Sequence, residues 1–211
     1  MSDSIAQQVA HDLLEIGAVS LKPTEPFTWA SGIKSPIYTD NRMTISYPTV
    51  RRNIYTGISA IIREHFPDVE VIAGTATAGI PHAAWVAQML DVPMIYVRSK
   101  PKDHGQGRQI EGVLKPGQKV VLIDDLISTG GSVLKAVDAV KNEGAEVLGV
   151  AAVFTYQLNA ADENFSARGL DYFAVTDYST LIDTAKAEDL ITESDIESLK
   201  KWRENPNQWN I

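Results

Sequence analysis

The chain of 211 residues has no cysteine and only four histidines. Without cysteine there are no disulfides, no thiolate catalysis and no cysteine-based zinc site, and the scattered histidines disfavour a metal site built from histidine alone. No apolar run reaches membrane-spanning length, and the N-terminus, MSDSIAQQVAHD, lacks the basic and apolar regions of a signal peptide. These absences predict a cytoplasmic protein with no membrane contact.

Positive charge is also scarce, with 19 Lys and Arg against 27 Asp and Glu and a net charge of −8. Nucleic-acid binding depends on clustered basic residues, so we expect no nucleic-acid partner. A small anionic ligand is compatible with this charge if basic residues gather where it binds. The length suits one domain spanning residues 1–211, and no repeat or linker divides it.

Strand and helix patterns alternate along most of the chain. Helices are predicted at about residues 5–16, 49–65, 81–90, 133–141 and 193–204, and strands at 69–73, 93–98, 120–123, 147–155 and 172–176. This alternation predicts an α/β domain with a mainly parallel sheet flanked by helices. The last helix is charged on one side, and we expect it to pack across the sheet or against a neighbour.

The segment Val120–Ser132, VVLIDDLISTGGS, carries the strongest functional signal. Its apolar start, Val120–Ile123, suits a strand buried on both faces, which places Asp124 and Asp125 at the carboxyl end. Ligands of open α/β sheets bind in the crevice outside those strand ends. The hydroxyls and glycines of residues 128–132 then lead into a helix, an arrangement that can hold a phosphate.

Simpler interpretations of this segment exist. It could be an ordinary strand–turn–helix junction with a solvated Asp125 and Ser132 as an N-cap. A P-loop NTPase also has an apolar strand with acids, but its phosphate loop is absent, and the nearest approach, Gly112–Lys119, has Gln118 in place of the lysine. GQGRQI, at residues 105–110, lacks the third glycine of a dinucleotide-binding motif.

The segment resembles the phosphoribosyl diphosphate (PRPP) signature of type I phosphoribosyltransferases. The resemblance implies that Asp124 and Asp125 hold the ribose 2- and 3-hydroxyls while the following loop wraps the 5-phosphate. The PRPP-binding residues it implies are Arg98, Lys102, His104, Asp124, Asp125, Leu126, Ile127, Ser128, Thr129, Gly130, Gly131 and Ser132.

A second glycine-containing segment, Gly74–Pro81 (GTATAGIP), lies between a predicted strand and a predicted helix. Small residues there could let backbone N–H groups hold a diphosphate, or could serve only close helix–strand packing. In the family that it resembles, this loop binds the diphosphate of PRPP. The resemblance assigns that role here to Thr75, Ala76, Thr77, Ala78 and Gly79.

The segment Arg98–Arg108, RSKPKDHGQGR, concentrates basic residues in an acidic chain. It has no apolar anchor and should be mobile over about residues 98–110, although such a run could also be a solvated charged surface. It resembles the catalytic loop of orotate phosphoribosyltransferases. The resemblance implies that Arg98, Lys102 and His104 are catalytic, that the loop closes over PRPP, and that a homodimer shares it between subunits.

The segment Phe27–Asp40, FTWASGIKSPIYTD, could be a surface loop with a buried aromatic residue. It resembles the pyrimidine-recognition segment of the orotate-specific enzymes. The resemblance implies a small N-terminal hood, mainly residues 1–45, and an orotate site formed by Ser128 together with Lys34, Ile37 and Tyr38.

Three positions depart from the family pattern. Ala30 and Ala78 stand where many members have lysine, and Tyr156 replaces an arginine. We hypothesise that Lys34, Lys100 and Lys102 supply the missing positive charge.

The resemblance implies transfer of ribose 5-phosphate from PRPP to orotate, giving orotidine 5-monophosphate and diphosphate, a step in de novo pyrimidine (UMP) biosynthesis. It implies a Mg²⁺ cofactor bound mainly through PRPP, with no direct protein ligand. Two alternatives stay open: a phosphoribosyltransferase for another base, and a PRPP-sensing regulator of nucleotide metabolism.

Overall fold

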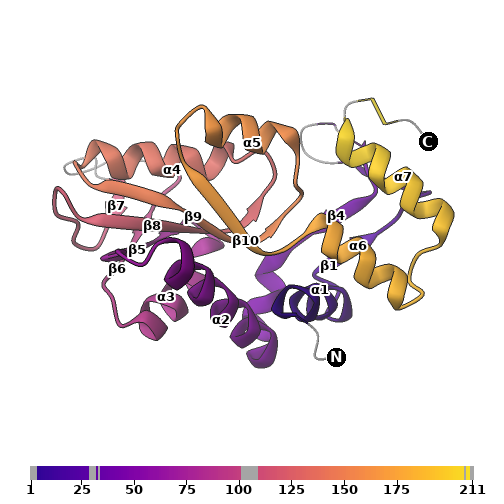
Figure 1. Ribbon diagram of the computed structural model, residues 1–211, viewed down its shortest axis with the longest axis horizontal. Helices are drawn as coiled ribbons and strands as arrows, with labels where there is room; N and C mark the ends of the chain where they lie inside the picture. Colours follow the sequence, from indigo (N-terminus) through magenta and orange to yellow (C-terminus); the bar gives the residue numbers. More distant parts are fainter. Residues whose placement is uncertain (1–3, 29–31, 33, 101–108, 207, 210–211) are drawn as a thin grey trace.

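A computed structural model describes residues 4–28, 32, 34–100, 109–206 and 208–209. Its centre is a six-stranded sheet, coloured magenta to orange in Figure 1. The strand order is β10 (Asp171–Asp177), β9 (Glu146–Thr155), β8 (Lys119–Ile127), β5 (Val71–Thr75), β6 (Met94–Val97) and β7 (Ile110–Glu111). All neighbours run parallel except β7, which pairs antiparallel with β6 at the edge. The predicted α/β class and mainly parallel sheet are confirmed.

Helices cover both faces of this sheet. Figure 1 shows α4 (Gly131–Asn142) and α5 (Asn159–Ser166) on one side, and α2 (Pro48–His65) and α3 (Gly79–Leu90) on the other. In α2, the residues Ile54, Ile58 and Ile62 recur every four positions and are all buried, which is the spacing of one helix face. Burial of apolar residues from both layers leaves the ends of the strands to carry polar chemistry.

The strands at the centre run further than the sequence pattern predicted. Strand β8 continues through both acids to Ile127, because Leu126 and Ile127 still pair with Phe154 and Thr155 of β9. Strand β5 is shifted by two residues and ends at Thr75. The predicted ends of these two strands were therefore wrong.

Two helices begin earlier than predicted. Helix α3 begins at Gly79 and α4 at Gly131, so both glycines are helical residues and not part of a preceding loop. The connection from β8 to α4 is therefore only three residues long, Ser128–Gly130. Such a short turn holds the end of the strand close to the start of the helix.

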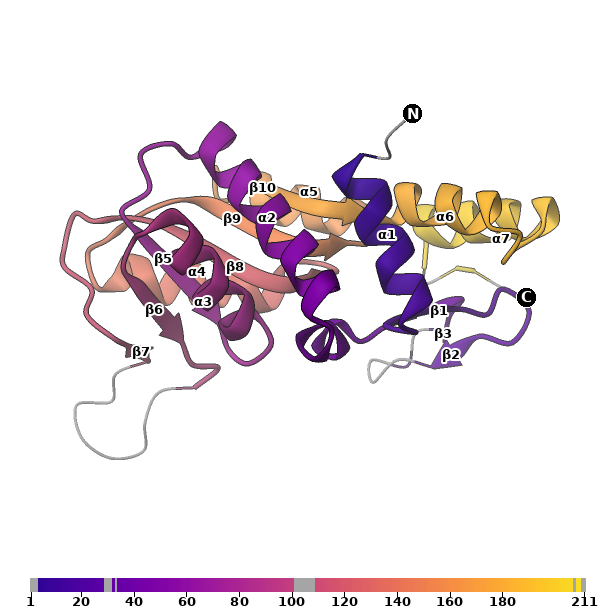
Figure 2. The same cartoon turned by 90° about the horizontal axis from the view of Figure 1, so that it is seen from below.

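The N-terminal segments form a separate layer beside the sheet. Helix α1 (Ile5–Glu15) begins with a capping box between Ser4 and Gln7. Two small antiparallel pairs follow, β1 (Val19–Leu21) with β4 (Ile37–Thr39) and β2 (Phe27–Thr28) with β3 (Lys34–Ser35), and then the 3-10 helix η1 (Asn41–Ser46). Figure 2 shows these strands next to the C-terminal helices, at one end of the molecule.

The C-terminal helices α6 (Tyr178–Ala187) and α7 (Glu193–Glu204) complete this layer. The buried side of α7 contains Trp202, whose indole Nε1 donates to the backbone oxygen of Lys34 at 3.0 Å. The Tyr178 hydroxyl donates to the oxygen of Leu199 at 3.0 Å. Helix α7 thus packs on β3 and α6 and not across the central sheet. No helix within the described ranges is long and apolar enough to span a membrane.

Candidate functional site

Two adjacent acids stand near the carboxyl end of the central strand β8. Asp124 is 7% exposed, and the backbone N–H of Asp125 donates to its Oδ1 at 3.0 Å. Burial, and then the neighbouring charge of Asp125, raise the pKa of Asp124, and burial also raises the pKa of Asp125. Two desolvated carboxyl groups side by side favour a ligand that brings hydrogen-bond donors or positive charge to them.

Asn41 ties the N-terminal layer to this strand. Its Nδ2 donates to the backbone oxygen of Asp125 at 2.6 Å, although the two residues are 84 positions apart. The Asn41 side chain is buried, and its Oδ1 accepts no hydrogen bond within the described part of the chain. The sequence did not predict a role for Asn41, because a single asparagine after a strand carries no signal of a partner so distant.

The loop Ser128–Gly130 is held in place by residues of α5. Gly130 has φ +76°, and a Cβ there would lie 2.5 Å from Cε2 of Phe165, so glycine is required on two grounds. The Asn164 side chain donates to the oxygen of Thr129 at 2.9 Å. The loop leads directly into the N-terminus of α4, where the first backbone N–H groups have no partner within the helix. This is an anion-binding geometry.

The second predicted phosphate loop lies next to the acid pair. Strands β5 and β8 are neighbours, with Gly74 opposite Ile123. A Cβ at Gly79 would collide with the Ile123 oxygen, so this glycine permits α3 to begin directly against β8. Thr75 is buried, Ala76 and Ala78 are half-buried, Thr77 is exposed, and the Ala76–Thr77 peptide bond is cis. The fold therefore brings both predicted phosphate loops together at the carboxyl ends of two neighbouring strands.

The basic segment emerges at the β6–β7 edge, with its two ends joined. The backbone N–H of Arg98 donates to the oxygen of Gln109 at 2.9 Å, and the Gln109 side chain donates back at 2.7 Å. The Arg98 guanidinium lies 3.8 Å from Glu111, and Lys100 is exposed. The predicted catalytic residues Lys102 and His104 lie outside the described residues.

The three hood residues that the resemblance assigned to orotate differ in exposure. Lys34 is exposed on β3. Tyr38 is 46% exposed, and its ring centroid lies 5.6 Å from that of Phe27. The Ile37 side chain is fully buried in the core. Of the three, Lys34 and Tyr38 therefore have solvent-exposed side chains and Ile37 does not. Ala30 lies outside the described part of the chain.

Tyr156 packs between the sheet and α7. It follows β9, its N–H donates to the oxygen of Ile127 at 3.0 Å, and its ring stands edge-on to Trp202 at 5.8 Å. Burial raises its pKa to about 12, so the phenol stays neutral. Where the family resemblance led us to expect an arginine, this chain therefore has an uncharged aromatic residue that joins the sheet to α7.

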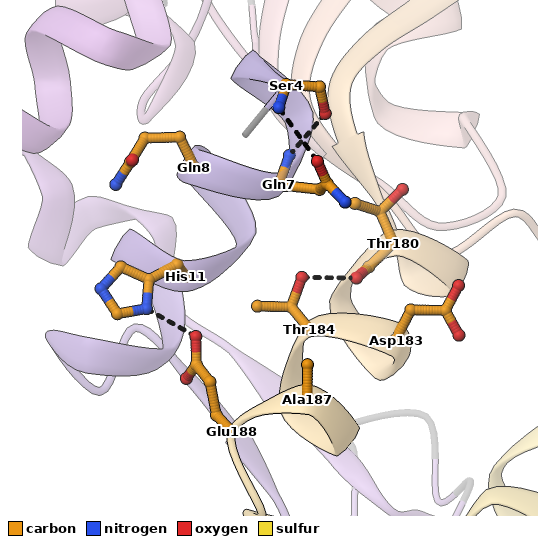
Figure 3. Close-up of a pocket in the computed structure, with 9 residues that line it drawn as sticks. All are labelled: Ser4, Gln7, Gln8, His11, Thr180, Asp183, Thr184, Ala187 and Glu188. Atoms are coloured by element: carbon orange, nitrogen blue, oxygen red, sulfur yellow. Dashed lines mark hydrogen bonds and ion pairs between the residues drawn. The ribbon is translucent and has the colours of Figure 1, made fainter. Parts of the chain in front are cut away.

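Another groove lies between α1 and α6 (Figure 3). It has a volume of about 680 Å³, and several of its polar groups bond within the chain. His11 pairs with Glu188 at 2.6 Å, and Thr184 donates to the oxygen of Thr180 at 2.8 Å. This groove contains none of the predicted site residues. We therefore place the candidate site at the carboxyl ends of β5 and β8.

Comparisons with known proteins show the family to which the chain belongs. Residues 49–187 match the family model described as a phosphoribosyl transferase domain. An orotate phosphoribosyltransferase of Lactiplantibacillus plantarum is 60% identical over 207 residues, covering 98% of each chain. The crystal structure of orotate phosphoribosyltransferase from Aeropyrum pernix is 26% identical with a TM-score of 0.75, covering 87% of this chain and 99% of that one. The Mycobacterium tuberculosis enzyme in complex with PRPP is 27% identical with a TM-score of 0.62, covering 84% and 98%.

Proposed function

The chain belongs to the orotate phosphoribosyltransferases of the phosphoribosyl transferase domain family, and from that premise we propose how its residues divide the reaction. It transfers ribose 5-phosphate from PRPP to orotate, giving orotidine 5-monophosphate and diphosphate, in pyrimidine biosynthesis. One observation supports our assignment of roles. The buried acid pair, the Ser128–Gly130 turn and the loop before α3 all lie at the carboxyl ends of the neighbouring strands β5 and β8.

The ribose is held by the acid pair in this proposal. The ribose 2- and 3-hydroxyls donate hydrogen bonds to Asp124 and Asp125, whose raised pKa values reflect carboxyl groups that water solvates poorly. Hydroxyl donors replace the missing water. The 5-phosphate lies against residues 128–132, where unpaired N–H groups and the N-terminus of α4 favour negative charge.

The diphosphate is held by residues 75–79 and by Mg²⁺. No group of three or more His, Asp or Glu side chains that could hold a metal occurs among the described residues. We propose that Mg²⁺ would be bound mainly by the oxygens of PRPP, where its charge would offset that of the diphosphate. Asp124 and Asp125 fit this arrangement without ligating the ion, because their carboxyl oxygens accept the ribose hydroxyls. An assay without added Mg²⁺ and with a chelator present should show no turnover.

The catalytic charge is assigned to Arg98, Lys102 and His104. As diphosphate leaves, the ring gains oxocarbenium character, and cationic side chains stabilise the leaving oxygens while His104 can donate a proton to them. Lys102→Ala or His104→Ala should lower kcat by about two to four orders of magnitude with a modest change in PRPP affinity. Normal turnover in both variants would remove the basic segment from the mechanism.

The base is placed beside Ser128, with Lys34 and Tyr38 from the hood. Lys34 is exposed on β3, so it can supply part of the positive charge that Ala30, Ala78 and Tyr156 lack. Lys34→Ala should raise the KM for orotate or PRPP. If both constants match those of the unmodified enzyme, Lys34 supplies no compensating charge.

A homodimer that shares its basic segment between subunits is a further part of the proposal, supported by the resemblance of residues 98–108 to the family's catalytic loop. Mixing His104→Ala with Asp125→Ala subunits should restore partial activity, because each heterodimer keeps one intact combination. A confirmed heterodimer without activity would contradict sharing. The cytoplasmic location expected from the sequence also stays a prediction, which cell fractionation checks.

The reaction itself is tested by an absorbance assay with PRPP and Mg²⁺ that compares orotate, uracil, adenine and xanthine. We expect consumption of orotate with release of diphosphate. Consumption of adenine but not orotate would contradict the assigned substrate.

A further inference from the structure

Arg42 brings a cationic side chain to the boundary between the hood and the acid pair. It follows Asn41, which bonds to the Asp125 backbone, and it comes three residues after β4, the strand that carries Tyr38. Asp40 raises the pKa of Arg42 most strongly, and the Tyr38 phenol and the Asp125 carboxyl contribute smaller effects. The bond from Asn41 to the Asp125 backbone fixes the chain next to Arg42 against β8, and the two smaller effects agree with a guanidinium near both groups.

Asp40 holds this guanidinium in a fixed orientation. Arg42 Nε donates to Asp40 Oδ1 at 2.6 Å, and Nη2 donates to Oδ2 at 2.8 Å. The backbone N–H of Arg42 also donates to the same carboxylate, at 3.2 Å. The Arg42 side chain remains 66% exposed. A two-point pair of this kind orients the guanidinium plane and leaves the Nη1 donors outside the pair.

The charge of the substrate explains why a cation is needed here. Orotate carries a carboxylate, and it must approach a site that already contains Asp40, Asp124 and Asp125. An anion in such a field binds poorly unless a positive group meets it directly. Arginine is suited to this task because its planar donors match the two oxygens of a carboxylate.

We propose that Arg42, oriented by Asp40 between Tyr38 and Asp125, binds the carboxylate of orotate and so selects this acid over neutral pyrimidines. The inference rests on the proposed orotate site. Asp40 acts as a positioning residue, since its contact is with the guanidinium and not with the base.

The test combines variants of the enzyme with a change in the charge of the ligand. Steady-state kinetics would give the KM for orotate and for PRPP in Arg42→Gln, Arg42→Lys and Asp40→Asn. The inhibition constant of orotate methyl ester, which lacks the negative charge, would be measured in each. Arg168→Gln is the matched control, because Arg168 forms another surface pair with an aspartate, Asp138, at 3.5 Å.

We expect Arg42→Gln to raise the KM for orotate about tenfold to a hundredfold, the usual range for a lost charge-assisted hydrogen bond. The KM for PRPP and the inhibition constant of the methyl ester should stay within about threefold. The KM for orotate in Arg42→Lys should lie between those of the wild type and Arg42→Gln, because lysine keeps the charge but lacks the planar pair of donors. Asp40→Asn should give a smaller rise, and Arg168→Gln none.

An orotate KM within twofold of wild type in Arg42→Gln would overturn the proposal, as would a rise confined to PRPP. Equal losses for orotate and its methyl ester would also overturn it, because charge recognition would then be absent. If Arg42→Gln does not fold, Arg42→Lys and Asp40→Asn decide the matter by the same comparison. Failure of the wild-type enzyme to consume orotate would instead contradict the proposed function.

Discussion

The side chain of Asn41 and the backbone of Asp125 are joined by a 2.6 Å hydrogen bond between the hood and the central strand. The donor is a buried amide at the start of η1, and the acceptor belongs to one of the two acids assigned to the ribose. Because both partners are at least partly shielded from water, water replaces this bond poorly. The position of the hood is therefore coupled to the position of the acid pair.

Asn41→Ala should destabilise the protein by about 1–3 kcal/mol, the range for leaving a buried polar group without its partner. It should also raise the KM for PRPP, since Asp125 loses its support. Urea unfolding and steady-state kinetics measure the two effects. Asn164→Ala is the control for stability, because it removes a similar amide-to-backbone bond at an exposed site. Equal losses in the two variants would contradict the special role of the buried bond.

Asp124→Asn should change how the stability of the ligand-free protein depends on pH. Burial raises the folded-state pKa of Asp124 above its unfolded value, so the folded protein retains this proton more strongly. The resulting stability is fully present below the unfolded pKa and is lost as pH rises through the folded pKa. Between pH 5 and pH 8 the wild type should lose stability that Asp124→Asn retains.

The measurement is urea unfolding without ligands at pH 5 and pH 8. Asp183→Asn, which changes an exposed acid on α6, serves as the control and should follow the wild type. Asp124→Asn should also weaken PRPP binding. If the free energy of unfolding changed equally with pH in the wild type and in Asp124→Asn, burial of the Asp124 carboxyl would not raise its pKa as described.

Gly130→Ala, at the end of the phosphate loop, and Gly131→Ala, at the start of α4, form a matched pair. At Gly130 a methyl group would meet the Phe165 ring and the backbone has a positive φ, so we expect a loss of about 2–4 kcal/mol. At Gly131 the nearest contact would be Thr129 Oγ1 at 3.7 Å and the residue is helical, so alanine should be neutral or slightly stabilising. Thermal unfolding compares them, and similar melting temperatures would contradict the packing described for Phe165.

Glu188→Gln should lower the pKa of His11. The hydrogen bond that Glu188 accepts from His11 is the main cause that raises this pKa, and the charge of Glu188 adds to the effect. A His pKa raised on folding contributes stability that is present below its unfolded pKa and lost as pH rises through the folded pKa. NMR titration of the His11 ring checks the shift.

Local chemistry made much of this protein predictable. Alternating apolar strands and helices indicated an α/β domain with a mainly parallel sheet, and the helix at residues 193–204 has the predicted bounds. The run from Val120 to Ser132 predicted a phosphosugar site, because acids, hydroxyls and glycines in that order have the chemistry to bind one. The family resemblance of residues 27–40 supplied the base, which the comparisons support.

The remaining features depended on residues far apart in the chain. The end of β8 at Ile127 was missed because its partner in β9 holds the strand beyond the acids. The burial of Ile37 and the contact of Trp202 with Lys34, 168 positions away, likewise depend on which segments meet in the fold.

The sequence by itself determined the class of fold and the family and predicted a sugar-phosphate site, because these rest on periodicity and on the properties of neighbouring residues. Only the tertiary structure decided that Asn41 bonds to the backbone of Asp125 and that Trp202 bonds to the backbone of Lys34. Contacts of this kind join separate segments, and no local pattern specifies them.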